Sequence, residues 1–295
     1  MFKYRKILFG FLVLALILGA ILLSLSTTKK SGSSSGLTEH SKIISLSPSA
    51  TEDLFAMGAG DRVIAVDDLS NFPSNAPISK LSAFNPNVEA LSAYQPDLVI
   101  INATATKAIS VESQLKSLGI DVYLEKTPTT LSDAYSEISD LGSLSGKTPS
   151  AAQLIASMKS KIAAAIKNGK SDRHLAIYHE LDNTLYSATS QTFIGRVYSS
   201  FHLTNIADAA AQADSGGYPQ LQREYLIKAN PDIIYLADAQ YGESAATVAK
   251  RAGWSSISAV SNGGVVALPA DIPSRWGPRL VDFYQLIATS LLSVK

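Results

Sequence analysis

The chain contains no cysteine. This absence excludes a disulfide framework, cysteine-ligated zinc, thiol chemistry and lipid attachment through cysteine. The chain also lacks an excess of charge of either sign, because its net charge is +0 and 17% of its residues are charged. Nucleic-acid binding usually needs a basic surface, so this balance argues against nucleic acid as a main partner.

Three enzyme signatures are missing as well. No G-x-G-x-x-G follows a predicted strand, no P-loop is present, and no G-x-S-x-G elbow joins a strand to a helix. We therefore expect a protein that is not an enzyme and has no catalytic residues. A two-lobed transferase stays open as an alternative, which turnover of sugar nucleotides would reveal.

Apolar residues, by contrast, make up 46% of the chain, enough for a large core in one or two domains. The longest apolar run covers residues 7–25 and follows a basic start, Lys3, Arg5 and Lys6. Its length is close to the ~20 residues that span a bilayer, and the basic flank directs the rest of the chain outside. This favours an uncleaved anchor in residues 1–26 over a cleaved signal, although the small residues around Ser24 and Ser26 suit cleavage. Residues 27–40, rich in serine and glycine, are interpreted as a flexible tether.

A unit of helix, Pro-Asp and strand occurs twice in the rest of the chain, over residues 89–101 and 224–236. Glu89 corresponds to Glu224, and Pro96 corresponds to Pro231. A helix cannot easily run through the residue before proline, which explains the break. The apolar run that follows suits a strand covered on both faces of a parallel sheet. The duplication predicts an α/β protein with two similar lobes, residues 41–147 and 171–295.

One long helix is predicted between the two copies, over residues 148–170. Thr148 can cap its start, Pro149 suits the first helical position, and Gly169 is a plausible end. Apolar residues recur along it at spacings of three and four, so one face is expected to pack against the lobes. These are Ala151, Ile155, Met158, Ile162 and Ile166.

Strands and helices alternate in both lobes, so both sheets are expected to be parallel, with ligands bound at the carboxyl ends of the strands. The segments that follow the predicted strands should line a shared cleft: residues 47–49, 67–70, 102–106, 179–186, 237–241 and 269–276. Residues 67–86 are expected to form a long polar loop. Ser49 and Glu52 have the spacing of a capping box, so a helix cap is the competing role for Ser49.

Histidine is scarce, which bears on a bare metal-ion receptor as another alternative. Such a receptor needs several histidine and carboxylate ligands in the cleft. Of the four histidines, His40 falls in the tether, His174 precedes a strand and His202 ends a helix. Only His179 is expected at the cleft, so we predict no metal-ligating set.

Several motifs together resemble one family. They are Ile44–Glu52, Gly58–Val63, both helix–Pro-Asp–strand units and Pro278-Arg279. They are similar to the periplasmic binding proteins that feed cobalamin and ferric-siderophore ABC importers, over about residues 41–295. The resemblance implies two α/β lobes joined by one backbone helix, and ligand capture outside the membrane for a permease dimer with a cytoplasmic ATPase. Many relatives are lipoproteins, and this chain departs from them by lacking the cysteine. No resident cofactor is implied, although the ligand could itself contain cobalt or iron.

Residues 271–279, here called the recognition loop, follow the last predicted strand and should emerge at the cleft. The resemblance implies that Asp271 and Arg275 keep the spacing of an aspartate and an arginine that reach corrin amides in cobalamin-binding relatives. This favours a corrinoid over a siderophore, with haem still open. Substituting Arg275 or Trp276 is expected to weaken binding without changing the stability of the empty protein. The resemblance also implies that Glu89 and Glu224 dock on the permease.

The cleft segments and the resemblance together give a set of candidate ligand-binding residues. Ordinary roles compete for many of them, since aspartates are common in turns and tyrosines in loops. The candidates are Pro48, Ser49, Asp68, Leu69, Phe84, Thr104, His179, Glu180, Tyr186, Tyr218, Tyr241, Asp271, Arg275 and Trp276.

Overall fold

The computed structural model describes residues 39–170, 173–210, 215–269 and 271–294. Its strands form two sheets whose neighbouring strands are parallel, as predicted, one in each lobe. The first sheet has the order β3-β2-β1-β4-β5 and the second has the order β7-β6-β8-β9. The strands are β1 (Ile43–Leu46), β2 (Val63–Asp67), β3 (Ile78–Leu81), β4 (Leu98–Asn102), β5 (Asp121–Glu125), β6 (Ala176–Glu180), β7 (Thr204–Asn205), β8 (Ile233–Leu236) and β9 (Val265–Ala267).

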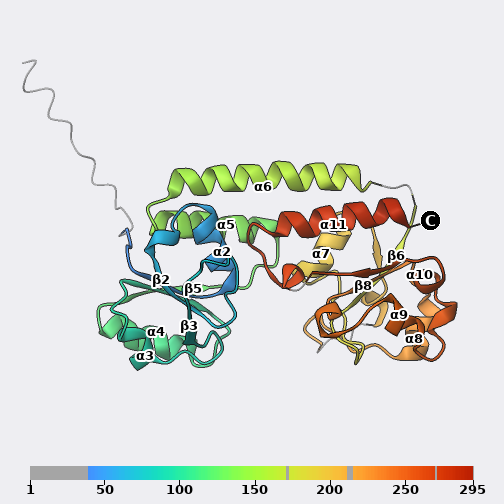
Figure 1. Cartoon of the computed structure of the whole chain (residues 1–295), viewed down its shortest axis with the longest axis horizontal. Coiled ribbons are helices and arrows are strands. Elements are labelled where there is room, and N and C mark those ends of the chain that lie inside the picture. Colours follow the sequence, from blue (N-terminus) through green and yellow to red (C-terminus); the bar gives the residue numbers. More distant parts are fainter. Residues whose placement is uncertain (1–38, 171–172, 211–214, 270, 295) are drawn as a thin grey trace, which may run out of the picture. The chain divides into compact units, whose positions relative to one another are not determined.

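Helices alternate with these strands and cover the sheets (Figure 1). In the first lobe, α2 and α5 lie on one side of the sheet, and α3 and α4 lie on the other (Figure 1). The helices are α2 (Pro48–Ala56), α3 (Val88–Ser92), α4 (Ala108–Ser117), α5 (Leu131–Leu144), α6 (Thr148–Asn168), α7 (Phe193–Ser199), α8 (Arg223–Ala229), α9 (Ala245–Ala249), α10 (Ser258–Ser261) and α11 (Leu280–Ser293).

The duplicated unit has the same structural role in both lobes. Its strands, β4 and β8, are interior strands of their sheets, and the four apolar residues of each are buried. The aspartate after the proline ties the neighbouring strand to the unit. Asp97 accepts backbone N–H groups of Ser41 and Lys42 just before β1, both at 2.9 Å, and Asp232 accepts the N–H of Ala176 at the start of β6 at 2.8 Å. The Pro-Asp pair therefore ends a helix and fixes the start of the adjacent strand.

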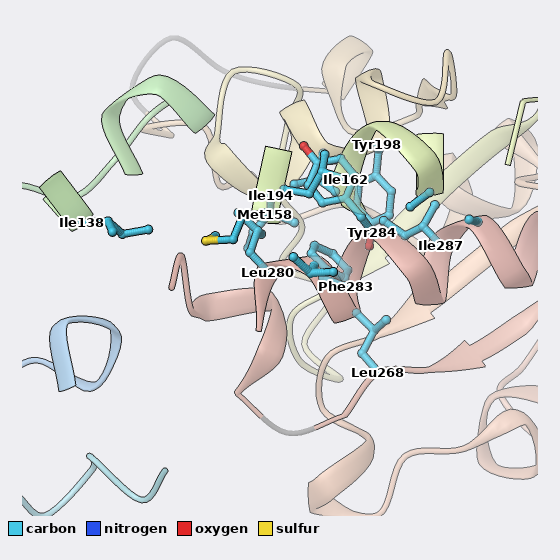
Figure 2. Close-up of a cluster of buried hydrophobic side chains, with 14 of the residues drawn as sticks. Ile138, Met158, Ile162, Ile194, Tyr198, Leu268, Leu280, Phe283, Tyr284 and Ile287 are labelled. Atoms are coloured by element: carbon cyan, nitrogen blue, oxygen red, sulfur yellow. The ribbon is translucent and has the colours of Figure 1, made fainter. Parts of the chain in front are cut away.

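Helix α6 connects the lobes, packing against α5 of the first lobe and α11 of the second. The predicted apolar face is confirmed: Ala151, Met158 and Ile162 are buried, and Ile155 and Ile166 pack against the same core. Figure 2 shows Met158 and Ile162 among aromatic and aliphatic side chains of α7 and α11. One continuous apolar core thus includes residues of both lobes, which makes α6 a packed brace rather than a linker.

Four predictions about local structure were wrong: a helix cap, a loop without a strand, the end of a strand and the assignment of His40 to the tether. Helix α6 is preceded by Lys147, so Thr148 is its first residue and not its cap. Residues 67–86 were predicted to form a loop, but they contain the strand β3, in which Ile78 pairs with Val66 of β2 in parallel. Strand β6 extends to Glu180, so His179 is in a strand and not in the following loop. His40, assigned to the tether, is buried with its N–H bonded to the carbonyl of Leu144 at 2.8 Å.

The predicted anchor and all of the tether except Glu39 and His40 lie outside the described residues. Among the residues that the structure describes, no helix has the length and apolar character needed to cross a membrane.

Candidate ligand-binding cleft

Two adjoining cavities lie where the recognition loop approaches the first lobe. The first, of about 240 Å³, is lined by strand-end segments of the first sheet and by the recognition loop. It contains seven of the candidate residues: Pro48, Ser49, Leu69, Phe84, Thr104, Arg275 and Trp276. The second cavity, of about 370 Å³, shares Thr127, Ser274 and Trp276 with the first and adds Tyr218. Trp276 therefore stands between the two cavities, with walls from both lobes around it.

Exposed apolar side chains surround this region. Phe84 is 72% exposed and Leu69 is 40% exposed on the first lobe, and Tyr218 is 43% exposed on the second. Large apolar side chains that remain exposed to water around a cavity indicate a site for a ligand or a partner. These residues are suited to contact the flat or apolar face of a ligand.

Helix α2 begins at the floor of the first cavity, and its cap differs from the prediction. Ser47 is the cap, since its Oγ accepts the N–H of Ala50 at 3.2 Å, and Pro48 occupies the first helical position. The capping box of Ser49 and Glu52 was therefore wrong. Ser49 Oγ is instead close to the backbone N–H of Trp276, at 3.3 Å, and Glu52 forms an ion pair with Arg279. Both side chains act between the lobes.

The recognition loop is held by polar contacts with the first lobe. Arg275 Nη2 donates to the carbonyl of Leu69 at 3.3 Å and lies 3.6 Å from Asp271. Asp271 in turn accepts Asn71 Nδ2 at 2.9 Å and adopts a left-handed backbone conformation with φ of 69°. Burial lowers the pKa of Arg275, with the charges of Asp271 and Glu52 opposing the shift. Asp271 lines neither cavity and positions the loop rather than forming the cavity wall.

Three other candidates lie outside both cavities. Asp68 is an exposed residue directly after β2, and Tyr186 bridges to Gln220 through its backbone. Tyr241 ends a short 3-10 helix, Ala239–Tyr241, and is 83% exposed. A ligand larger than the two cavities would be needed to reach them.

His179 and Glu180 have buried structural partners instead of facing these cavities. The Nδ1 atom of His179 is 2.8 Å from the hydroxyl of Tyr198, and burial lowers the pKa of His179 to about 3. Glu180 forms two hydrogen bonds with Arg251, each 2.6 Å long. Burial raises the pKa of Glu180 to about 6, although Arg251 opposes the shift. The strand extends two residues further than predicted, which turns both side chains into the interior.

His179 should make the fold acid-sensitive. Because its folded-state pKa lies below the ordinary value of 6.5, its contribution to stability is full above pH 6.5 and is lost as pH falls towards 3. We expect His179→Gln to be less stable than the wild type at pH 7.5. The difference should shrink by about 2 kcal/mol at pH 5, at about 1.4 kcal/mol per pH unit. Urea unfolding at both pH values measures this.

His174→Gln is the matched control, because His174 is exposed. It should change stability little at either pH. An unchanged gap between His179→Gln and the wild type at pH 5 and 7.5 would contradict the assignment.

A buried group of acids lies beneath the loop. Ser47 Oγ and Asn102 Nδ2 donate to Glu125, at 2.6 and 3.1 Å, whereas Asp53 and Glu137 are buried without a hydrogen-bond partner among the described residues. Burial, together with the charge of Glu125, raises the pKa of Glu137 to about 12 and raises that of Asp53 well above its usual range. Burial therefore favours the neutral form of both side chains. Across the described part of the chain, no three histidine or acidic side chains converge in a way that could hold a metal ion.

Several cavity residues were missed by the sequence analysis. Glu125 ends β5 and Thr127 follows it, so the rule applied to the other strand ends would have found both. Thr192 caps α7, Phe193 is its first residue, and both line the second cavity. Five further lining residues, Ser47, Asn102, Ala105, Pro273 and Ser274, lie in segments that were predicted to line the cleft, although none was named as a candidate. The remaining missed residues are Leu46, Ala83, Pro128, Thr129, Gln191, Ile194 and Gly216.

Glu89 and Glu224 occupy the same position in the two copies of the repeat. Each is the second residue of its helix, α3 or α8, and each is exposed. Asn87 caps α3 by accepting the N–H of Ala90 at 2.9 Å, so Glu89 is not needed as the cap. The two carboxylates are surface charges presented by equivalent elements of the two lobes.

Comparison with known proteins agrees with this architecture. Residues 43–272 match the family described as periplasmic binding protein. The chain is 33% identical to the uncharacterized ABC transporter substrate-binding lipoprotein YvrC of Bacillus subtilis, covering 86% of this chain and 80% of that protein. It is 28% identical to a cobalamin-binding protein of Halobacterium salinarum, covering 88% and 72%. The fold resembles the periplasmic haem-binding protein HutB of Vibrio cholerae, with a TM-score of 0.75, 21% identity, and 84% and 97% coverage.

Two lobes with parallel sheets, the brace helix α6 and a cleft between the lobes define a two-lobed binding protein. The chain belongs to the periplasmic binding protein family. Its relatives are binding proteins rather than enzymes.

Proposed function

We propose that this chain is the extracytoplasmic substrate-binding component of an ABC importer and that it captures a corrinoid. The observation that carries the proposal is the position of Trp276 between two cavities with walls from both lobes, with Arg275 beside it in the wall of the first cavity. An indole offers a flat apolar surface, and a guanidinium offers donors for amide oxygens at a ligand's rim. The names of the Bacillus and Halobacterium relatives support the transport role and the ligand class.

The chemistry of the cavity walls favours a ligand whose metal needs no bond from the protein. Among the described residues that line the two cavities, none is histidine or methionine. Haem iron is usually held by an axial histidine, methionine, cysteine or tyrosine. A corrinoid such as cyanocobalamin brings its own axial ligands to cobalt, so hydrogen bonds and apolar contacts suffice to hold it.

A haem receptor is the second candidate, because Tyr218 lines the second cavity and tyrosine can be an axial ligand. Burial raises the pKa of Tyr218, which disfavours the phenolate that would bind iron. A ferric siderophore is a third ligand class, for which Arg275 would pair with anionic groups.

The test is a binding screen of the purified protein with cyanocobalamin, haemin and a ferric hydroxamate, by absorbance and calorimetry. We expect saturable 1:1 binding of cyanocobalamin that is tighter than binding of the other two. Preference for haemin would favour the second candidate, and binding of none would refute the proposal. Release of product from a sugar nucleotide would instead indicate a transferase.

The proposed partners are a permease dimer with a cytoplasmic ATPase, and the membrane through the N-terminal segment. We expect the mature protein to retain residues 1–26, because its apolar run is long enough to span a bilayer and its flank is basic. N-terminal sequencing of protein from the membrane fraction measures this. A mature N-terminus at or after Thr27 would show that the segment is a cleaved signal.

A further inference from the structure

The recognition loop belongs to the second lobe in sequence, yet its polar contacts are with the first lobe. The backbone N–H of Trp276 donates to Ser49 Oγ, and Arg275 donates to the carbonyl of Leu69, both at 3.3 Å. Ser49 is the second residue of α2 and Leu69 follows β2, so both acceptors belong to the first lobe. The two side chains proposed to meet the ligand are therefore placed by the opposite lobe.

Glu52 is the centre of these contacts. Its carboxylate accepts Arg279 Nε at 2.9 Å and also accepts Arg279 Nη2, so the pair is bidentate. The Nε atom of Arg275 lies 4.0 Å from the same carboxylate. The side chain of Glu52 is 2% exposed, and those of Arg275 and Arg279 are 13% and 18% exposed. Water screens such a buried pair poorly, so the attraction between the charges stays strong. The bidentate geometry also fixes the orientation of Arg279 relative to Glu52.

The spacing on α2 makes the two contacts act together. Ser49 and Glu52 are three residues apart, so they lie on the same face of the helix. Gly277 lets the loop lie against this face, because a Cβ there would be 3.2 Å from both the carbonyl oxygen of Ser49 and Oδ1 of Asp53. Glu52 lines neither cavity, whereas Ser49, Arg275 and Trp276 line the first. Glu52 therefore does not line the space for a ligand, and its contacts with Arg275 and Arg279 connect it to the loop that does.

Electrostatics support the same arrangement. The hydrogen bonds from Arg279 to Glu52 raise the pKa of Arg279, against the effect of burial. Arg279 also lies over the ring of Phe72, 4.4 Å from its centroid. Its guanidinium thus joins α2, the 67–72 segment of the first lobe and the start of α11.

We propose that Glu52 is a positioning residue that holds Arg275 and Trp276 of the second lobe against α2 of the first lobe before ligand arrives. The ligand then meets one assembled surface rather than two halves that must close on it. Preassembly lowers the entropic cost of binding. The inference rests on the proposed function in that the ligand occupies the cavity beside Trp276.

The first arm of the test needs no ligand. The chain has two tryptophans, so Trp254→Phe leaves Trp276 as the sole indole reporter. In that background, Glu52→Gln is expected to shift Trp276 emission to the red and to increase quenching by acrylamide about twofold, because the loop is released into water. Arg279→Lys keeps the charge but loses the bidentate geometry, so it should give an intermediate result and covers the case in which Glu52→Gln does not fold.

The control is Glu39→Gln. Glu39 pairs with Arg62 at 2.5 Å in the first lobe but has no contact with the loop among the described residues. It should leave the emission and the quenching of Trp276 unchanged. Unchanged emission and quenching in both Glu52→Gln and Arg279→Lys would overturn the positioning role.

The second arm uses cyanocobalamin as the probe. We expect Glu52→Gln to weaken its binding about tenfold and Arg279→Lys to weaken it less, with Glu39→Gln equal to the wild type. Weaker binding without a change in Trp276 emission would also contradict the inference, because the effect would not pass through the loop. If the wild type binds no cyanocobalamin, the corrinoid proposal fails, while the emission arm still decides the role of Glu52.

Discussion

Reversing the charge of both docking candidates, with Glu89→Lys and Glu224→Lys together, is expected to abolish uptake while ligand affinity stays at the wild-type value. The two residues are exposed second residues of α3 and α8, and they line neither ligand cavity. A two-fold permease can offer one basic group to each lobe, so the pair would set orientation as well as attraction. Two reversed charges would replace two attractions by two repulsions. Each single reversal should reduce uptake only in part.

Uptake of radiolabelled cyanocobalamin by cells with the complete importer measures the first result, and calorimetry on the purified variant measures the second. A control variant, Asp61→Lys with Asp140→Lys, makes the same change in net charge on exposed positions. Asp140 belongs to α5, on the other side of the first sheet from α3 (Figure 1). The control should transport normally. Normal uptake by the Glu89 and Glu224 double variant would refute docking through these residues.

Truncation of either proposed ligand contact, Arg275→Ala or Trp276→Ala, is expected to weaken cyanocobalamin binding by about 1–3 kcal/mol, the usual range for central interface residues. Trp276 contributes a flat wall shared by both cavities, and Arg275 contributes hydrogen-bond donors to the first. Trp276→Phe keeps an aromatic face, so its loss should be smaller. Calorimetric titration measures all three variants.

The sequence predicted that substituting Arg275 or Trp276 would leave the stability of the empty protein unchanged, and the structure alters this prediction for Arg275. Arg275 bonds the Leu69 carbonyl and lies near Glu52, so Arg275→Ala should lower the melting temperature of the empty protein modestly. Arg196→Ala, an exposed residue of α7, and Trp254→Phe, a buried one in the second lobe, are the matched controls for affinity. If neither Arg275→Ala nor Trp276→Ala changed affinity, the recognition loop would not contact the ligand.

The features that sequence alone determined are those whose causes lie close together along the chain. The Pro-Asp pairs at 96–97 and 231–232 end a helix and start a buried strand, and the parallel sheets followed from these alternations. The strand β8 ends at Leu236, where the second repeat unit was predicted to end. The apolar face of α6 was also predicted, because helical periodicity is a local property.

The tertiary structure decided which side chains meet across the lobes. Glu52 and Arg279 are 227 residues apart, as are Ser49 and Trp276, and no local pattern encodes either contact. Ser49 and Glu52 looked like a capping box because that motif depends on spacing alone, whereas the cap depends on where the helix begins. His179 was predicted at the cleft because the strand was expected to end before it. In the structure, β6 includes His179 and Glu180, and both side chains are buried. Sequence thus specified the elements and their order, while packing between distant segments determined the partners of the polar side chains at the cleft.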